Sequence, residues 1–513
     1  MTACSPSGVG VRRYRDLVAP SELLNLAEAH RVAALGALDA STQTSLGQFF
    51  TPAAAAMLIA SLPRLPLTGS VRILDPGAGS GMLSAALVAR VLEERSDLSV
   101  HIVAVECDES VLPHLRATLN ACVSAGRGRI TAEVVEADFI LSATGLDAVD
   151  ALTSGFELVV QNPPYGKLGT TNPHRQAVRR AGLDAPNLYA AFLALSVAAL
   201  RPGGQLVAIT PRSFFNGPYF GAFRSYMLDH LALDRIHVFE SRSTVFADTG
   251  VLQENVIFSG TLDGGRANVT LSISTGHNDE VTTREVPYAE VVHPGDPHRF
   301  IRLATDAEDT AIAELMLALP CSLRDLGIEV STGRVVDFRS RSALHADDPG
   351  SAYPLIYPGN LRGGGVEWPR SIRKAQFFAP TETKDHGLLL PEGWYTVVKR
   401  FTAKEERRRI VGSVWSPVEH PGPVAFENHL NVFHIKGEGL DASIARGLAV
   451  WLNSSIVDRF FRTFSGHTQV NATDLRTLRF PTLESLRQLG EQATPSEQAD
   501  IDALVSVVSK VAA

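Results

Sequence analysis

Residues 73–83 read ILDPGAGSGML, a short apolar run that passes through a glycine-rich turn into a second apolar stretch. This order predicts a strand, a tight turn and a helix, because glycine lets the backbone turn sharply and approach a ligand closely. The spacing is neither the GxGxxG of dinucleotide-binding proteins nor a P-loop, since no Gly-Lys-Ser/Thr follows. A turn of this kind also occurs without any ligand, so its meaning depends on the neighbouring strands.

Strand-like and helix-like segments alternate around this turn. The strand-like runs are 71–74, 101–105, 130–135, 157–160, 205–209, 235–239 and 256–258. The clearest helix-like segments are 21–40, 82–94, 110–122, 187–200 and 220–230. This alternation predicts an α/β fold in which helices cover both faces of a mostly parallel sheet. Because no helix-like segment separates the last two runs, we expect them to form an antiparallel hairpin.

Acidic residues follow the second and third predicted strands. Glu106 ends the second strand, 25 residues after Gly81, where an acid can accept hydrogen bonds from both hydroxyls of a ribose. Asp138 and Phe139 follow the third strand, where they can hold and cover an adenine ring. Taken singly, Glu106 also fits a solvated strand end and Asp138 a helix cap. Together, at the carboxyl ends of parallel strands, they predict a site for an adenosine-containing ligand without pyrophosphate, such as S-adenosylmethionine.

The stretch 157–169, ELVVQNPPYGKLG, places a stiff turn at the end of the fourth strand. Pro163 and Pro164 fix φ and remove two backbone donors, and they keep Asn162 out of the helical region. An exocyclic amine on a ring is a poor nucleophile because its lone pair is delocalised. Carbonyl groups of Asn162 and Pro163 that accept hydrogen bonds from this NH2 would free the lone pair for a methyl donor held in line. Tyr165 would supply a stacking face for the planar substrate.

The composition sets the broad class. With 513 residues, 45% of them hydrophobic and 20% charged, the chain is typical of a globular protein of two or three domains. The net charge of −8 argues against binding nucleic acid over the whole surface but not against a local basic face. Four scattered cysteines argue against a disulfide scaffold or a zinc site. We find no signal peptide and no apolar segment of membrane length, so we expect a cytoplasmic protein without a membrane partner.

After about residue 265, Gly- and Pro-rich segments interrupt shorter apolar runs. We expect a second domain to begin near residue 300 after a β-rich connector. Residues 331–413 contain 14 Lys and Arg against 9 Asp and Glu. Six cations here can neutralise phosphates: Lys399, Arg400, Lys404, Arg407, Arg408 and Arg409. The aromatic residues among them, Trp394, Tyr395 and Phe401, can stack on bases or pack in a core. The alternative is a solvated helix face, since Glu405 and Glu406 interrupt the basic run.

A polar loop at 465–469 contains His467 and Gln469 and suits contact with a DNA groove or backbone, or serves as a capped turn.

Residues 46 to about 260 resemble an S-adenosylmethionine-dependent N6-adenine DNA methyltransferase. NPPY at 162–165 resembles its catalytic signature, DPGAGSG at 75–81 its cofactor loop, and LGQFFTPAAAAMLIASL at 46–62 the segment that precedes the loop. The order of these motifs is similar to the gamma class. The resemblance implies that the cofactor contacts Phe50, Thr51, Pro52, Asp75, Gly77, Ala78, Gly79, Glu106, Asp138, Phe139 and Asn162. It implies a catalytic role for Asn162, Pro163, Pro164 and Tyr165. Phe246, in a stretch where the family keeps an aromatic residue against the flipped base, is the second candidate for contact with adenine, with core packing as its alternative.

The C-terminal part resembles the target-recognition region of stand-alone type II modification methylases of the Eco57I-like and BsuBI/PstI-like group. The matching stretches are VSTGRVVDF, FENHLNVFHI and WLNSSIVDRFFRTFSGHTQVNATDLRTLRFP. We therefore expect a helical extension at 1–45, a catalytic domain at 46–265, and a connector with an α+β DNA target-recognition domain at 266–513. The DNA contacts predicted there are Lys399, Arg400, Lys404, Arg408, His467 and Gln469.

The resemblance implies sequence-specific methyl transfer to N6 of an adenine flipped out of double-stranded DNA. It also implies a restriction-modification system with a separately encoded restriction endonuclease, and we expect the methyltransferase to be a monomer that needs no metal. Three alternatives stay open: an enzyme acting on RNA or a protein glutamine, a methylation subunit that needs a separate specificity subunit, and a DNA-binding protein without catalysis.

Overall fold

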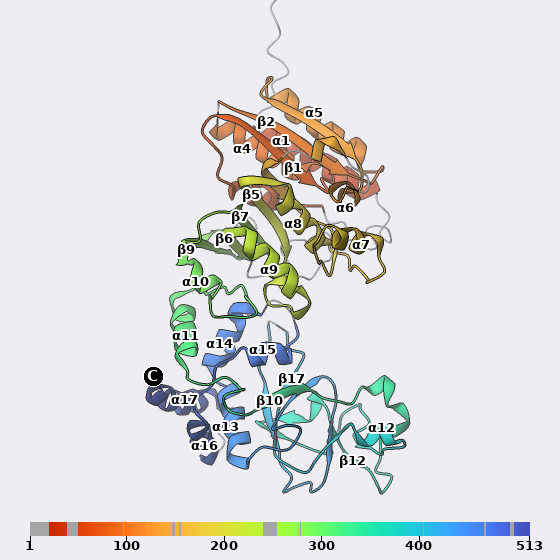
Figure 1. The fold of residues 1–513 in the computed structure, drawn as a ribbon, viewed down its shortest axis with the longest axis vertical. Helices are drawn as coiled ribbons and strands as arrows, with labels where there is room; N and C mark the ends of the chain where they lie inside the picture. Colours follow the sequence, from red (N-terminus) through yellow and green to blue (C-terminus); the bar gives the residue numbers. More distant parts are fainter. Residues whose placement is uncertain are drawn as a thin grey trace, which may run out of the picture. The chain divides into compact units, whose positions relative to one another are not determined.

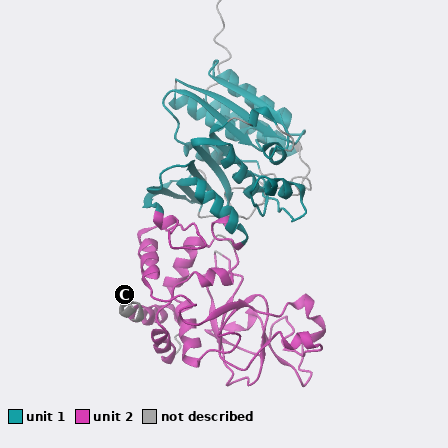
Figure 2. Ribbon diagram, viewed as in Figure 1, with its two compact units in different colours: residues 1–212, 219–288 teal, residues 213–218, 289–513 magenta. Residues whose placement is uncertain are grey.

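The computed structural model describes residues 20–37, 50–95, 97–145, 149–152, 155–239, 254–276, 279–403, 405–465, 468–492 and 497–512. The chain divides into two compact units, residues 1–212 with 219–288 and residues 213–218 with 289–513 (Figure 2). The short segment 213–218 thus belongs to the second unit, although the elements on either side of it belong to the first.

The described strands of the first unit form one sheet of nine, in the order β3-β2-β1-β4-β5-β7-β6-β8-β9 (Figure 1). The bounds are β1 Gly69–Pro76, β2 Leu98–Glu106, β3 Ile130–Glu136, β4 Phe156–Gln161, β5 Leu200–Pro211, β6 Leu231–Phe239, β7 Asn255–Leu262, β8 Asn268–Ser274 and β9 Thr282–Pro287. The pairings among β1 to β5 are parallel. All seven predicted strands form, and the mostly parallel α/β sheet is confirmed.

The last strands complete the sheet on one side. β6 and β7 pair antiparallel, which confirms the predicted hairpin, and β7 lies between β5 and β6. β8 pairs parallel with β6, and β9 pairs antiparallel with β8. The first part of the predicted β-rich connector therefore extends the sheet of the first unit.

Helices of the first unit fall into two groups that pack among themselves (Figure 1). One group is α1 Pro20–Ala37, α3 Ala53–Ser61, α4 Met82–Glu94 and α5 Leu112–Ala125. The other is α6 Phe139–Ala143, α7 Pro173–Arg180, α8 Leu188–Ala199 and α9 Gly221–His230. The central strands lie between these layers and are buried nearly throughout, as expected for parallel strands covered on both faces.

The register of the parallel strands aligns their carboxyl ends. Asp75 of β1 pairs with Ala104 of β2, and Glu106 of β2 pairs with Glu136 of β3. On the other side, Leu74 pairs with Val159 of β4. The turns that follow β1, β2, β3 and β4 therefore meet at one edge of the sheet, the edge at which open α/β sheets bind ligands.

Two smaller sheets form the second unit. One has the order β10-β20-β17-β18-β14-β13 and the other β11-β15-β12-β19-β16. The strands of the first are β10 Glu329–Thr332, β20 Leu430–His434, β17 Tyr395–Lys399, β18 Gly412–Trp415, β14 Gly365–Val366 and β13 Leu361–Arg362. Those of the second are β11 Leu344–His345, β15 Phe377–Phe378, β12 Tyr353–Ile356, β19 Val424–Phe426 and β16 Leu389–Leu390.

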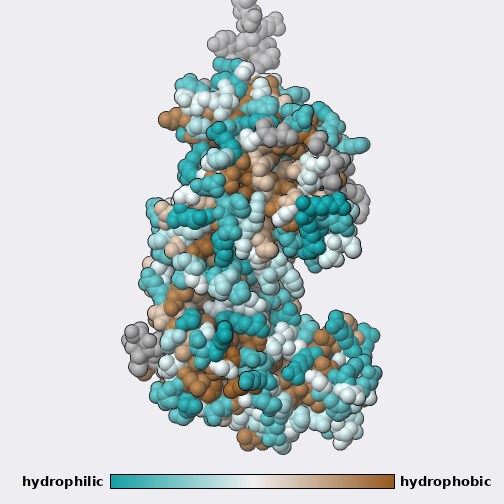
Figure 3. Space-filling view, in the orientation of Figure 1, coloured by the Kyte–Doolittle hydropathy of each residue, from teal (hydrophilic) through white to brown (hydrophobic). Residues whose placement is uncertain are grey.

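Helices of the second unit accompany its two sheets, and most of these helices contribute to a core of large side chains that includes Trp451, Phe460, Phe461 and Phe464. They are α10 Tyr288–Val291, whose first residue still belongs to the first unit, α11 Ala307–Ala318, α12 Thr383–His386, α13 Ala442–Leu452, α14 Ser455–Phe464, α15 Ala472–Arg476, α16 Leu483–Glu491 and α17 Gln498–Ala512. Among the described helices, none has both the length and the apolarity needed to cross a membrane. On the face shown in Figure 3, hydrophilic residues cover most of both units and hydrophobic residues appear in scattered groups.

Candidate functional site

The turn after β1 has the backbone that its glycines predict. Gly77, Gly79 and Gly81 have φ values of +69°, +55° and +83°, a region that side-chain-bearing residues rarely adopt. The N–H groups of Gly77 and Ala78 donate to the Val105 carbonyl at 2.9 and 3.0 Å. A Cβ atom at Gly79 would lie 3.0 Å from the ring of Phe50. The turn is therefore fixed against β2 and admits only glycine at its closest approach.

Glu106 supports this turn from the end of β2. Its Oε2 accepts a hydrogen bond from the Gly79 N–H at 2.8 Å, and its Oε1 accepts from the N–H groups of Cys107 and Asp108, each at 2.9 Å. The residue is 5% exposed, and burial raises the pKa of its carboxyl group. Three of its roughly four acceptor positions are thus used, which leaves one for a ribose hydroxyl. Glu106 is not the solvated strand end of the alternative interpretation.

Asp75, at the end of β1, is a buried carboxylate whose two oxygens differ in their hydrogen bonding. Its Oδ2 accepts a hydrogen bond from the Ser84 hydroxyl at 2.7 Å. Its Oδ1 has no hydrogen-bond partner among the described residues, and the residue is 1% exposed. Burial raises the pKa of Asp75 to about 7. A cationic group brought to this edge of the sheet would compensate the charge.

Asp138 caps a helix and also forms an ion pair. Its Oδ1 accepts a hydrogen bond from the Leu141 N–H at 3.0 Å at the start of α6, and its Oδ2 lies 2.9 Å from Nε2 of His174 on α7. Burial alone would raise the pKa of Asp138, but the bonds from His174 and Leu141 outweigh it and lower this pKa. The same bond raises the pKa of His174. The neighbouring Phe139 is buried, with its ring centroid 5.1 Å from that of Phe192.

The segment before α3 connects the glycine turn to the catalytic motif. Phe50 is 7% exposed and lies against Gly79, as described above. Thr51 accepts a hydrogen bond from Nδ2 of Asn162 at 3.0 Å. Pro52 caps α3, and its carbonyl accepts from the Ala56 N–H at 2.9 Å. The structure therefore brings this predicted segment beside both motifs.

The turn after β4 holds the Asn162 amide in one orientation. Its Nδ2 donates to Thr51, and its Oδ1 accepts a hydrogen bond from the Tyr165 hydroxyl at 3.1 Å. Pro163 is buried and Pro164 is half-buried, so the turn is anchored while Asn162 stays accessible. Donation to Thr51 identifies Nδ2 as the donor and Oδ1 as the acceptor of this amide, and the Tyr165 hydroxyl keeps Oδ1 in place.

Tyr165 belongs to a cluster of aromatic rings. Its ring meets that of Tyr189 edge-on with centroids 6.3 Å apart, and Tyr189 stacks on Phe220 at 5.6 Å. Burial raises the pKa of Tyr165, so its hydroxyl stays protonated and able to donate. Phe246, the other residue predicted to contact the base, lies outside the described residues.

Two segments of the second unit that were predicted separately to contact DNA are hydrogen-bonded to each other. The Val470 N–H donates to the Arg400 carbonyl at 2.7 Å, and the Thr402 N–H donates to the Thr468 carbonyl at 3.0 Å. Phe401 and Gln469 form a β-bridge. A third segment joins them, because the Arg400 N–H donates to the His429 carbonyl at 2.9 Å. We call residues 399–402, 427–429 and 468–470 the rim.

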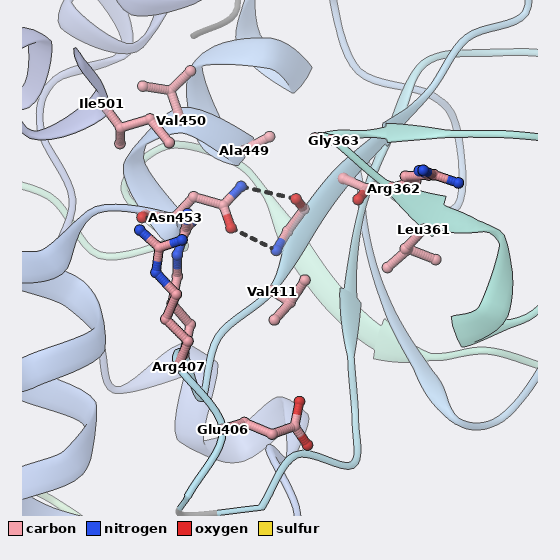
Figure 4. Close-up of a pocket in the computed structure, with 14 residues that line it drawn as sticks. Leu361, Arg362, Gly363, Glu406, Arg407, Val411, Ala449, Val450, Asn453 and Ile501 are labelled. Carbon is pink, nitrogen blue, oxygen red and sulfur yellow. Dashed lines mark hydrogen bonds between the residues drawn. The ribbon is translucent and has the colours of Figure 1, made fainter. Parts of the chain in front are cut away.

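The predicted DNA-binding residues divide between the rim and other places. Lys399, Arg400 and Gln469 lie on the rim and are half-buried. Arg408 instead lines a pocket of about 330 Å³, where its Nη1 donates to the Asn453 carbonyl at 3.0 Å. Figure 4 shows this pocket, in which Asn453 forms two hydrogen bonds with Gly412. Lys404 and His467 lie outside the described residues.

The basic run 405–410 is not a helix, so the solvated helix face of the alternative interpretation is wrong. The phosphate contact is also wrong for Arg409, because its side chain is 1% exposed and donates from Nε to the Thr402 hydroxyl at 3.2 Å. Tyr395 is buried and Trp394 half-buried, with the guanidinium of Arg446 5.2 Å from the Trp394 ring. These two aromatic side chains pack, and Phe401 alone of the three is exposed.

Comparison with known proteins identifies the family of this chain. Residues 116–246 match the family described as Eco57I restriction-modification methylase. The type II methyltransferase M.PstI of Providencia stuartii is 39% identical over 495 residues, which are 95% of this chain and 97% of the relative. M.BsuBI of Bacillus subtilis is 40% identical over 457 residues, 88% of this chain and 90% of the relative. The chain belongs to the type II methyltransferases.

Family membership confirms the predicted resemblance, the enzyme class, and S-adenosylmethionine as the cofactor of this methyltransferase. The fold is similar to that of the type IIL restriction-modification enzyme MmeI in its complex with DNA, with a TM-score of 0.51 and 10% identity over 96% of this chain and 74% of that one. The likeness extends beyond the sheet, so it supports the predicted fold class for both parts of the methyltransferase.

Sequence reasoning missed two residues of this site. Ser84 gave a weak signal, since it is a hydroxyl among the apolar residues of the first two turns of α4. His174 gave none, because its contact with Asp138 depends on how α6 and α7 pack.

The buried charge of Asp75 gives the methyltransferase a measurable pH dependence. A pKa of about 7, above the unfolded value of 3.8, means that the ionised form is disfavoured in the folded protein. This group therefore adds stability as the pH falls through 7, and its contribution is complete below 3.8. We expect Asp75→Asn to raise Tm by about 5 °C at pH 8 without cofactor, and the difference to shrink by pH 5.

Thermal unfolding at several pH values tests this prediction. Asp184→Asn is the control, because it makes the same chemical change at a side chain that is 47% exposed. A constant Tm difference between Asp75→Asn and the wild-type protein from pH 5 to pH 8 would contradict it.

His174 should act on cofactor binding as a positioning residue. Its bond to Oδ2 fixes the carboxylate that is proposed to meet the cofactor adenine. We expect His174→Ala to raise the Kd for S-adenosylmethionine about 5-fold, the loss of one charge-assisted bond in a partly exposed site, with kcat at saturating cofactor unchanged. His174→Gln, which keeps a donor, should recover part of the affinity. Arg180→Ala, an exposed residue of the same helix, is the control, and calorimetry showing wild-type affinity for His174→Ala would refute the role.

Proposed function

We propose that this protein transfers a methyl group from S-adenosylmethionine to N6 of an adenine in double-stranded DNA, within one specific sequence. The observation that carries the proposal is the oriented amide of Asn162, whose Nδ2 donates to Thr51 and whose Oδ1 accepts from the Tyr165 hydroxyl. Activation of an exocyclic amine requires an oriented hydrogen-bond acceptor close to the methyl donor. Asn162 lies at the end of β4, at the sheet edge where the cofactor would bind.

The catalytic turn acts by positioning and electrostatics. Asn162 Oδ1 and the Pro163 carbonyl accept hydrogen bonds from the two N–H groups of the adenine amine, so that the nitrogen becomes more tetrahedral and its lone pair is available. Tyr165 covers one face of the ring and, through its hydroxyl, holds Oδ1 in place. The proton leaves after methyl transfer, so the step needs no strong base beforehand.

The residues at the sheet edge fit S-adenosylmethionine, which supplies an electrophilic methyl group on a sulfonium. The unpaired Oδ1 of Asp75 suits a cation, and the glycine turn lets a ligand approach the backbone. Glu106 would accept from the ribose and Asp138 from the adenine, while Phe139 would line the adenine pocket. Phe50, Thr51 and Pro52 would hold the methionine end. Each role is part of the proposal.

The adenine must leave the duplex before the turn can reach it, because its amine is enclosed in the stack. The second unit would then read the sequence, with Lys399, Arg400 and Gln469 of the rim on the DNA. We further propose that the protein works in the cytoplasm as a monomer beside a separately encoded restriction endonuclease.

Transfer of labelled methyl groups by the purified protein, followed by mass spectrometry of the nucleosides, tests the proposal. We expect N6-methyladenine in duplex DNA and no label in total RNA or in cell protein. Label in cytosine, in RNA or in a protein glutamine would overturn it. A requirement for a second polypeptide before DNA is labelled would instead show a methylation subunit with a separate specificity subunit.

A further inference from the structure

Two phenylalanine side chains of the second unit are exposed. Phe338 is 64% exposed and Phe401 is 42% exposed. Within the described part of that unit they are the only aromatic side chains among the exposed large hydrophobic residues. Single exposed apolar side chains are common on protein surfaces, so the informative feature of these two positions is what lies beside each ring.

Each of the two rings has an arginine beside it. Cζ of Arg339 lies 5.4 Å from the ring centroid of Phe338, and Cζ of Arg400 lies 5.8 Å from that of Phe401. The His429 ring lies on Phe401 as well, with centroids 5.0 Å apart. Phe338 and Phe401 thus share one feature, an exposed aromatic ring next to a guanidinium group.

The two phenylalanines lie on backbone segments that meet at one loop. Phe401 is part of the rim. The segment that leads to Phe338 binds the same rim, because the Asn428 N–H donates to the Val335 carbonyl at 2.8 Å and the Val335 N–H donates to the Phe426 carbonyl at 3.0 Å. Phe338, in the short 3-10 helix Asp337–Arg339, therefore follows a segment that is hydrogen-bonded to the rim that carries Phe401.

His429 is held rigidly against Phe401. The buried carboxylate of Glu427, with its side chain 2% exposed, accepts a hydrogen bond from the His429 N–H at 2.9 Å and contacts the imidazole Nδ1. A ring fixed in this way loses little conformational freedom on binding, which favours stacking on a planar ligand.

Nucleic acid fits this surface better than a protein partner does. Bases offer planar faces that stack on aromatic rings, and phosphates next to them pair with arginine. A docking protein would need a continuous apolar patch, whereas the rim surrounds its phenylalanine with Arg400, Thr468 and Gln469.

We propose that Phe338 and Phe401 contact the bases of the DNA duplex, while Arg339 and Arg400 neutralise the adjacent phosphates. This inference rests on the proposed function and adds to it the surface that the DNA meets. Phe401 with His429 offers the larger aromatic contact of the two.

The salt dependence of DNA binding separates the two kinds of contact. The full-length protein is titrated with duplexes that carry the sequence it methylates, at several salt concentrations and with a non-reactive cofactor analogue. We expect Phe401→Ala and Phe338→Ala each to raise the Kd about 10-fold with an unchanged slope of log Kd against log salt. Arg400→Ala should reduce that slope by about 1. Val418→Ala, at a residue that is 78% exposed in the same unit, is the matched control and should change neither quantity.

Wild-type affinity in the Phe338→Ala/Phe401→Ala double variant would overturn the inference while leaving the proposed function intact. A slope lowered by either phenylalanine variant would also overturn it. Phe401→Leu keeps most of the side-chain volume but loses the flat ring, so it controls for an effect of Phe401→Ala on folding. Its Kd for DNA should lie between those of the wild-type protein and Phe401→Ala. Absence of DNA methylation by the wild-type protein would instead refute the proposed function.

Discussion

Replacing Asn162 by alanine is expected to lower kcat for DNA methylation by at least about 100-fold, while the Kd for S-adenosylmethionine changes less than about 5-fold. The substitution removes the Oδ1 that accepts from the target amine, an interaction made in the transition state, and losses of this kind cost roughly 10²–10³ in rate. Thr51 loses a donor at the same time, but the Glu106–Gly79 contact of the cofactor edge is untouched. Single-turnover kinetics and calorimetry measure the two quantities separately.

Asn172→Ala is the matched control for this variant. Asn172 lies ten residues farther along and uses its side chain only as a helix cap, accepting from the His174 N–H at 2.9 Å at the start of α7. Its loss should cost about 1 kcal/mol of helix stability and little catalysis. If Asn162→Ala lost cofactor binding but kept its turnover, the catalytic assignment of Asn162 would fail.

Replacing Glu106 by alanine should have the largest effect on cofactor binding, a rise in Kd of about 100-fold. The variant loses the acceptor for the ribose and the support for the Gly79 N–H, and each charge-assisted bond is worth about 1.5–3 kcal/mol. Because burial raises the pKa of this carboxyl group, the affinity of the wild-type protein should fall as the pH is lowered through that raised pKa. Calorimetric titration over a range of pH measures both effects.

Glu136→Ala provides the control, because Glu136 pairs in register with Glu106 at the end of the neighbouring strand. Its side chain is 53% exposed and forms an ion pair with Arg116, away from the glycine turn, so we expect an unchanged Kd. Equal losses in the two variants would show that strand ends in general, rather than the carboxylate of Glu106, support binding.

The sheet and the edge at which it would bind ligands could be predicted, because local sequence patterns determine them. Apolar runs predict β1 to β5 and the glycine-rich turn predicts the end of β1, while Glu106 at the end of β2 and Asp138 after β3 are read directly from the sequence. The connector was harder to predict, because the sequence indicates only that it is β-rich, and the pairing of β8 with β6 and of β9 with β8 is known only from the fold.

The side-chain partners could not be predicted because they depend on tertiary packing. His174 reaches Asp138 only when α7 packs on α6. Arg409 belongs to a basic run that is typical of a phosphate-binding surface, yet the chain turns it into the core beside Phe461. Phe401, predicted to stack or to pack, and Gln469, predicted to contact DNA, are 68 residues apart, and the bridge between them is visible only in the fold.

The most direct test of the central claim is a map of modified bases in plasmid DNA from a methylation-free host that expresses this chain alone. Long-read sequencing should find N6-methyladenine at a single short motif, and the modification should disappear with Asn162→Ala. Unmodified DNA, with a folded protein that binds S-adenosylmethionine, would contradict the account and direct attention to a separate specificity subunit or to an RNA or protein substrate.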